Sequence, residues 1–296
     1  LVLALAVTVI EVALIVSVMI AGGPDKAGLA RDTVFAAVMI ICNGLVGLCL
    51  LSGGVRHFEQ GFQLQGALAA LAVLAALTTL SLVLPNFATT LPGPVLSNAQ
   101  LAFAGVASLV LYVSFVFVQT VRHRDYFLDD DAREGTAEAE GVAVSRPVVL
   151  ASLGLLPLSL VAVVLLAKLE SKPLERAVAA AGLPHTVVGV VIAALVLLPE
   201  GIASVRNAAA NRLQTSINLA LGSALASIGL TIPAVAALSL ALHQPLALGL
   251  PPASTVLLVL TLFVSSLTLG TGRTTVLQGV VHLVIGAVFL LLSAVP

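Results

Sequence analysis

The chain is built from nine apolar runs, each long enough to cross a membrane, with short polar connections between most of them. A helix of about 20 apolar residues spans a hydrocarbon layer about 30 Å thick. Because backbone groups in that layer have no water to bond with, the runs must be helices or the strands of a closed barrel. They are continuous rather than alternating, which excludes the barrel. The sequence predicts an all-α polytopic membrane protein with spans near 1–22, 32–53, 66–84, 99–120, 147–167, 183–205, 213–242, 251–270 and 274–295.

Composition supports this fold class and narrows the partners. Hydrophobic residues make up 59% of the 296 residues and charged residues only 9%, whereas soluble domains carry about 25% charged residues. The formal net charge of −1 gives no sign of a nucleic-acid partner. The expected partners are the lipid bilayer, inorganic cations and protons, and self-association stays open. Cys42 and Cys49 lie on one span about 10 Å apart in helical rise, too far for a disulfide, so we interpret them as small apolar residues.

Residues 121–146 form the one long polar segment and hold seven of the fourteen acids. Such a segment is typical of a solvated linker. It divides the chain into a first transmembrane repeat at 1–120 and a second at 147–296. Basic residues are more frequent in the loops on the linker side, which predicts a cytoplasmic linker. Those on the linker side are Arg56, Arg122, Arg124, Arg133, Arg146, Arg206, Arg212 and Arg273, and those on the other side are Lys26, Arg31, Lys168, Lys172 and Arg176.

The two halves look related. In each, a span that carries a glutamate, Glu11 or Glu200, is followed by a short polar loop and a span with spaced small or polar residues. We place these alpha repeats at 1–53 and 183–242. The second half has one span before its acidic span and the first has none, so one more span upstream of Leu1 would give a five-plus-five plan. Five is odd, and the repeats would therefore have inverted orientations, as in many secondary transporters.

Glu11 and Glu200 are the acids placed well inside spans. An ionised side chain at mid-membrane costs about 2.5–3.5 kcal/mol on insertion scales. No Lys or Arg lies at a comparable depth, so each acid must bind a proton or a metal cation. Desolvation favours the protonated form of a carboxyl group and a nearby cation favours the ionised form, so one site holds either partner but not both. This competition predicts an exchanger; the alternative is that each Glu is a permanently protonated packing residue.

The spans that follow the two acids supply neutral oxygen atoms. A hard cation takes about six oxygen ligands, and hydroxyl, amide and backbone oxygens can complete a carboxylate site. Pro199 removes a helical hydrogen bond, so we expect an unwound turn at 198–201 with backbone oxygen beside Glu200. The alternative is that small and hydroxyl residues allow close helix packing. The stripe in the second half is Ser216, Ala220, Ser223, Ser227 and Thr231, with Ser204 as a weaker candidate, and the stripe in the first half is Asp32, Ala36, Met39, Asn43 and Gly47.

Other polar residues near the spans have two interpretations each. Asp32 is either a residue at the mouth of the site that attracts cations or a helix N-cap, and we favour the N-cap. His185 and His282 are interfacial or packing residues rather than proton relays. The acidic run at 129–131 belongs to a solvated linker unless it concentrates cations.

No motif for nucleotide binding, zinc binding or a catalytic nucleophile is present in the sequence, so we expect neither an enzyme, nor a resident cofactor, nor ATP-driven transport. The alternative to an exchanger is a cation channel that uses the same acids.

Several stretches resemble one known family. LVLALAVTVIEVALIVS around Glu11 and the segment from VVGVV to GLTIP around Glu200 are similar to the two alpha repeats of the calcium:cation antiporter superfamily. Within it, the chain is most similar to the calcium/proton exchanger branch and to ChaA-type cation/proton antiporters of bacteria. Further similar stretches are GLCLLSGGVRHFEQGF at 47–62, FVQTVRHRDYF at 117–127 and TGRTTVLQGVVHL at 271–283.

This resemblance implies a ten-helix core in a bacterial inner membrane, alternating access, and binding of the cation or proton by Glu11 and Glu200. Related plant and fungal exchangers have a Gly-Asn pair before each repeat acid, which Ala6–Ile10 and Leu195–Pro199 lack. They also have a Gly-Ser-x-x-Ser-Asn run, of which the first repeat keeps Asn43 and the second keeps Gly222, Ser223 and Ser227. Fewer polar ligands leave room for sodium or potassium as well as calcium.

Overall fold

The computed structural model of the protein describes residues 28–128, 176–184, 186–243 and 246–295, with isolated positions from 12 to 173. Glu11, His185, the acidic stretch 129–146 and almost all of the predicted spans 1–22 and 147–167 lie outside the described residues. The described part contains seven helices that are long and apolar enough to cross a membrane. They coincide with the other seven predicted spans to within a few residues at each end, and the all-helical membrane class is confirmed.

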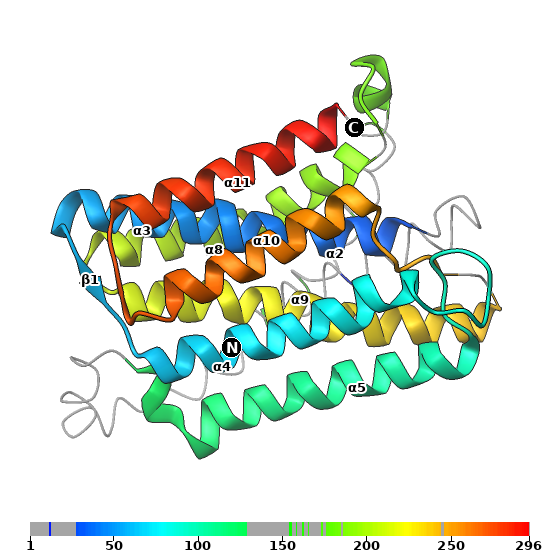
Figure 1. The fold of residues 1–296 in the computed structure, drawn as a ribbon, viewed down its shortest axis with the longest axis horizontal. Coiled ribbons are helices and arrows are strands. Elements are labelled where there is room, and N and C mark those ends of the chain that lie inside the picture. Colours follow the sequence, from blue (N-terminus) through cyan, green and yellow to red (C-terminus); the bar gives the residue numbers. More distant parts are fainter. Residues whose placement is uncertain are drawn as a thin grey trace.

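The spans run side by side along the long axis of the molecule (Figure 1). In chain order they are α2–η2–α3 (Leu29–Met39, Ile40–Leu45, Val46–His57), α4–η3–η4 (Leu64–Thr78, Thr79–Val83, Leu84–Asn86), α5–η5 (Asn98–Phe117, Val118–Arg122), α8 (Thr186–Ala209), α9 (Leu213–Leu242), α10 (Pro252–Leu269) and α11 (Val276–Ala294). The first three spans each contain a π-helical turn, which is η2, η3 or η5.

Connections at one end of the bundle tie the two halves of the chain together. Strand β1 (Gln60–Gly61) pairs antiparallel with β2 (Arg273–Thr274), and the short helix η6 (Arg124–Phe127) packs against α4 and α9. Gln60 Nε2 donates hydrogen bonds to the Ala208 carbonyl at 3.0 Å and to Asn211 Oδ1 at 2.9 Å. Loops that are far apart in the sequence therefore meet at one membrane surface, as spans of alternating direction require.

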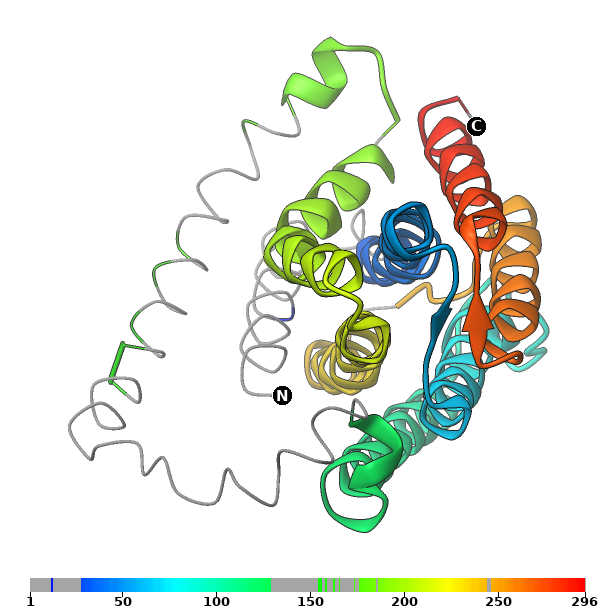
Figure 2. The same ribbon diagram turned by 90° about the vertical axis from the view of Figure 1, so that its left-hand side faces the viewer.

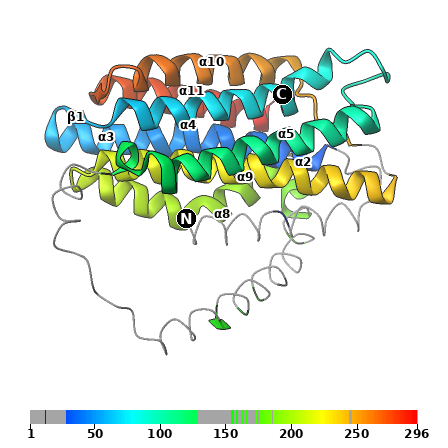
Figure 3. The same ribbon diagram turned by 90° about the horizontal axis from the view of Figure 1, so that it is seen from below.

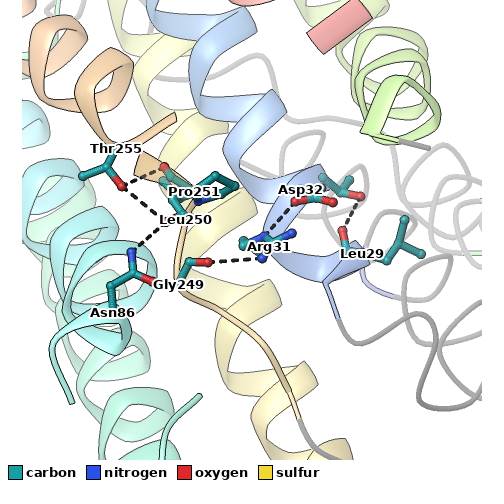
Figure 4. A network of polar contacts seen from close by, with 9 residues as sticks. Leu29, Arg31, Asp32, Asn86, Gly249, Leu250, Pro251 and Thr255 are labelled. Carbon is teal, nitrogen blue, oxygen red and sulfur yellow. Dashed lines mark hydrogen bonds and ion pairs between the residues drawn. The ribbon is translucent and has the colours of Figure 1, made fainter. Parts of the chain in front are cut away.

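A second polar network closes the opposite end (Figure 4). Arg31 Nε lies 2.7 Å from Asp32 Oδ1, and Arg31 Nη1 donates to the Gly249 carbonyl at 3.2 Å. Asn86 Nδ2 donates to the Leu250 carbonyl at 2.7 Å. The N-cap of α2 is Gly28, so our assignment of Asp32 as an N-cap is wrong: Asp32 lies within the first turn and pairs with the neighbouring guanidinium.

Two spans form the centre of the bundle. The α2–η2–α3 span lies between α8 on one side and α10 and α11 on the other (Figure 2). Helix α9 packs against α2, α4, α5 and α8, and α5 lies along it (Figure 3). Glycine permits close approaches between spans: a Cβ added at Gly229 would lie 2.7 Å from Tyr112 Cβ, and one added at Gly279 would lie 2.6 Å from the Leu51 backbone nitrogen.

Candidate cation site

Glu200 lies on the protein-facing side of α8. The buried residues on this side are Ala193, Leu197, Glu200, Ser204 and Ala208, spaced by three or four positions, whereas Leu195, Leu198 and Ile202 are exposed. This helical periodicity turns the carboxylate into the bundle rather than toward lipid. Glu200 has 0% of its surface exposed.

The carboxylate of Glu200 is only partly satisfied by the described residues. The Ser223 hydroxyl on α9 donates a hydrogen bond to Glu200 Oε2, while Oε1 has no hydrogen-bond partner in the part of the chain that the structure describes. One turn further along α8, the hydroxyl of Ser204 is also buried and has no partner within the described ranges. No Lys or Arg within the described ranges forms an ion pair with Glu200. A buried polar atom without a partner costs about 1–3 kcal/mol. A proton or a cation bound to Glu200 Oε1 and Ser204 Oγ would remove this cost.

The expected unwound turn at Pro199 is wrong. Helix α8 continues through Pro199 and Gly201 without interruption. A proline removes only the hydrogen bond to the carbonyl four residues earlier, here that of Leu195. Packing of α8 against α2, α3 and α9 keeps the flanking turns helical, as neighbouring helices commonly do for prolines in membrane spans.

The hydroxyl stripe of α9 divides into two parts. Ser216 Oγ donates to the Ser204 carbonyl at 2.7 Å and to the Arg212 carbonyl at 3.1 Å, so it fastens α9 to α8. Ser223, Ser227 and Thr231 are buried further along the same stripe. Ser223 is the member that contacts Glu200. The Oγ1 atom of Thr231 has no partner among the described residues.

Asn43 points away from Glu200. It lies in the π-helix η2 and has 0% of its surface exposed. Its Nδ2 donates to Thr261 Oγ1 at 2.9 Å, and its Oδ1 lies 3.4 Å from His282 Nδ1. These partners belong to α10 and α11, and the structure does not bring the Asn43 amide to the Glu200 carboxylate.

The same turn nevertheless packs against the helix that carries Glu200. Turn η2 packs against α8 and α9, and a Cβ added at Gly201 would lie 3.6 Å from Leu45 Cδ1. A π-helical turn inside an α-helix frequently occurs at a functional site. The non-α turn that packs against α8 and α9 is therefore in the first repeat and not at Pro199.

The structure adds polar residues that the sequence interpretation did not select. Thr261, Ser265 and Thr268 form a buried stripe on α10. Their spacing of four and three positions was a usable signal, because hydroxyl groups repeated on one face of a span indicate an interior face. His282 is a buried, hydrogen-bonded residue of the interior. Within the described parts of the chain, no three His, Cys, Asp or Glu side chains lie close enough together to hold a metal ion. A cation bound at Glu200 would therefore need neutral oxygen ligands from the residues described.

These features define an all-helical integral membrane protein with a buried carboxylate–hydroxyl site between α8 and α9. The profile of the sodium/calcium exchanger protein family matches residues 1–121 and 151–295. The chain belongs to this family, and the resemblance to the calcium:cation antiporter superfamily is confirmed.

Individual relatives are consistent with that assignment. The chain is 61% identical over 295 residues to the y4hA protein of Sinorhizobium fredii (strain NBRC 101917 / NGR234), provisionally described as an ionic transporter; the match covers 99% of this chain and 79% of the relative. It is 32% identical over 299 residues to the sodium-potassium/proton antiporter ChaA of Escherichia coli (strain K12), covering 98% and 79%. The crystal structure of the H+/Ca2+ exchanger CAX shares the fold, with a TM-score of 0.69, 16% identity, and coverage of 98% of this chain and 77% of that one. These proteins are transporters and not enzymes.

Proposed function

We propose that this protein is a secondary active transporter that exchanges cytoplasmic sodium, potassium or calcium ions for external protons at a central site built around Glu11 and Glu200. The observation that carries the proposal is the enclosed Glu200 carboxylate, which has one oxygen atom hydrogen-bonded to Ser223 and the other without a partner among the described residues. A carboxylate of this kind can hold a proton or join a cation's ligand shell. The names of ChaA and CAX support the choice of ions.

Alternating access follows from an inverted repeat of five plus five spans, in which Glu11 is the counterpart of Glu200. The packing of the described helices supports this plan, because α5 packs along α9 and α11 packs along α3. The last span of each half thus packs against the span that follows the acid of the other half, as a two-fold relation between repeats predicts. The match of one family profile to both halves supports it as well.

The proposed cycle has two states. With the site open to the cytoplasm, Glu11 and Glu200 release protons and bind a cation with help from Ser223, Ser227, Ser204 and the polar first-repeat turn at Asn43. With the site open to the outside, protons displace the cation. The linker at 121–146 would lie in the cytoplasm, and the membrane would be the bacterial inner membrane.

Proton competition tests this function directly. In vesicles that contain the full-length protein and an internal pH dye, adding NaCl, KCl or CaCl2 should drive protons in the opposite direction. As the pH falls in the acidic range, the apparent KM for the transported cation should rise about tenfold per pH unit if one carboxylate must lose a proton, and about a hundredfold if both Glu11 and Glu200 must. Cation flux that is independent of the proton gradient and far faster than carrier turnover would instead indicate a channel.

Replacement of Ser223 tests the composition of the site. In Ser223→Ala, the Glu200 carboxylate loses its hydroxyl donor, and the apparent KM for the cation should rise about tenfold or more, as for lost metal-site partners generally. Ser239→Ala is the matched control, because Ser239 is buried on the same helix about 24 Å away in helical rise. Equal KM values for the two variants would remove Ser223 from the site.

A further inference from the structure

Helices α5 and α9 lie side by side (Figure 3), but they are not equally close along their whole length. A Cβ added at Gly105 would lie 3.3 Å from Ala236 Cβ, and one added at Gly229 would lie 2.7 Å from Tyr112 Cβ. Seven positions before Gly229, on the same face of α9, a Cβ added at Gly222 would meet no atom within 4 Å. The two helices are therefore in contact over one half of this interface and apart at the end that carries η6.

The separation forms a cavity of about 390 Å³ between α5, η5, η6 and α9. Its volume falls in the range of small-molecule sites, about 300–1,000 Å³. Where the helices converge, the lining is apolar and includes Phe115 and Val116, whereas toward η6 it is polar and includes Gln119, Arg124 and Asn218. A molecule that fits this cavity therefore has an apolar part and a polar part.

The polar end of the cavity is suited to an anion. Arg124 is the one charged side chain in the described lining. The side chains of Arg124 and Gln119 form no hydrogen bond or ion pair with other described residues. The Asn218 amide is already engaged, because its Nδ2 donates to the Phe127 carbonyl and its Oδ1 accepts another hydrogen bond. A guanidinium group that shares a cavity with a free amide matches the oxygen atoms of a phosphate group.

The apolar end of the cavity is next to the lipid-facing surface of α5. This helix lies at the edge of the described bundle (Figure 2), and Val113, Phe117 and Val121 on α5–η5 are 56%, 53% and 67% exposed. An alkyl chain that leaves the cavity can therefore continue along an apolar surface. A molecule with alkyl chains and a phosphate group is a phospholipid, and basic pockets between membrane helices typically bind the head groups of anionic lipids.

We propose that this cavity is a binding site for one anionic phospholipid from the membrane leaflet at the η6 end of the bundle. The phosphate group lies at Arg124 and Gln119, and one acyl chain lies between Phe115 and Val116 of α5 and Gly222 of α9. The bound lipid fills the space between the two helices and holds α5 against α9. The proposal does not depend on which ions the protein transports.

A titration of the purified full-length protein in detergent, followed by native mass spectrometry, tests the polar end. The wild type should bind one phosphatidylglycerol more tightly than phosphatidylcholine. Arg124→Gln should raise the Kd for phosphatidylglycerol about tenfold or more, since it removes a charge-assisted hydrogen bond. Arg122→Gln is the matched control: it removes the same charge two positions away, but Arg122 does not line the cavity, so the Kd should change less than about twofold.

Two further measurements test the acyl chain. Gly222→Leu places a side chain in the cavity and should also raise the Kd for phosphatidylglycerol about tenfold, with Arg124 intact. Glycerol phosphate at 10-fold excess should not displace the lipid, because it has no chain to occupy the apolar end. Equal Kd values for Arg124→Gln and Arg122→Gln, or no preference for phosphatidylglycerol over phosphatidylcholine, would overturn the proposal. Displacement by glycerol phosphate would assign the cavity to a soluble phosphate compound and reject the lipid.

Discussion

Glu200→Gln should reduce cation-driven proton movement to the level of protein-free vesicles. Glutamine has nearly the same size and can accept the Ser223 hydrogen bond, but it has no proton to exchange and no charge to balance a cation. Because the carboxylate is fully enclosed next to Ser223 and Ser204, no bulk solvent can replace its function. The measurement is the dye signal of vesicles after addition of NaCl, KCl or CaCl2.

The same variant should remain folded. Replacing a buried ionisable group by a neutral one removes a charge that is costly in the membrane interior, so stability should be unchanged or higher. The buried free thiols of Cys42 and Cys49 offer a readout, since they become reactive to a maleimide dye when the bundle unfolds. Glu59→Gln is the matched control, because Glu59 is exposed and its 3.6 Å pair with Arg273 contributes little at the surface. Wild-type transport by a folded Glu200→Gln protein would reject the carboxylate mechanism.

The spans could be predicted from the sequence because the membrane imposes a strict length and polarity on each of them. The enclosed position of Glu200 followed from the same constraint: an acid within an apolar run must face protein or a cation. The structure agrees, since Ala193, Leu197 and Ser204 share its buried face. Local sequence patterns were sufficient here, because the bounds of a span and the buried position of Glu200 both depend on residues within a few helical turns.

Pairing between helices could not be predicted in this way. Asn43 and His282 are 239 positions apart in the sequence, and their contact depends on which faces of η2 and α11 pack together. The π-helical turn IICNGL carries no local sequence signal that separates it from an α-helix. The effect of Pro199 was misjudged for a related reason: the packing of α8 against three neighbours decides whether a proline opens the helix. Glu11 lies outside the described residues, so its place beside Glu200 stays a prediction.

Gly279→Ala should destabilise the protein, and this is the second-largest effect that we expect. Helix propensity and helix packing predict changes of opposite sign in its free energy of unfolding. Alanine is about 1 kcal/mol more favourable than glycine inside a helix, so propensity alone predicts a more stable protein. A Cβ at this position, however, would lie 2.6 Å from the Leu51 backbone nitrogen and 3.0 Å from the Gly47 carbonyl oxygen. Overpacking of this kind costs about 1–3 kcal/mol, and the upper end applies because neither contact is a flexible side chain. We expect a net loss of about 2 kcal/mol.

Gly222→Ala is the matched control for this prediction, because a Cβ at Gly222 would meet no atom within 4 Å. Propensity acts alone there, and stability should be unchanged or higher in the maleimide assay. The consequence of Gly279→Ala extends to the buried polar contacts of α11, since Gly279 lies one turn before His282 on this helix. Separation of α11 from α3 would lengthen the 3.4 Å contact between His282 and Asn43. If Gly279→Ala is as stable as Gly222→Ala, α11 can move away from α3 at little cost, and close helix packing does not hold the Asn43 turn in place.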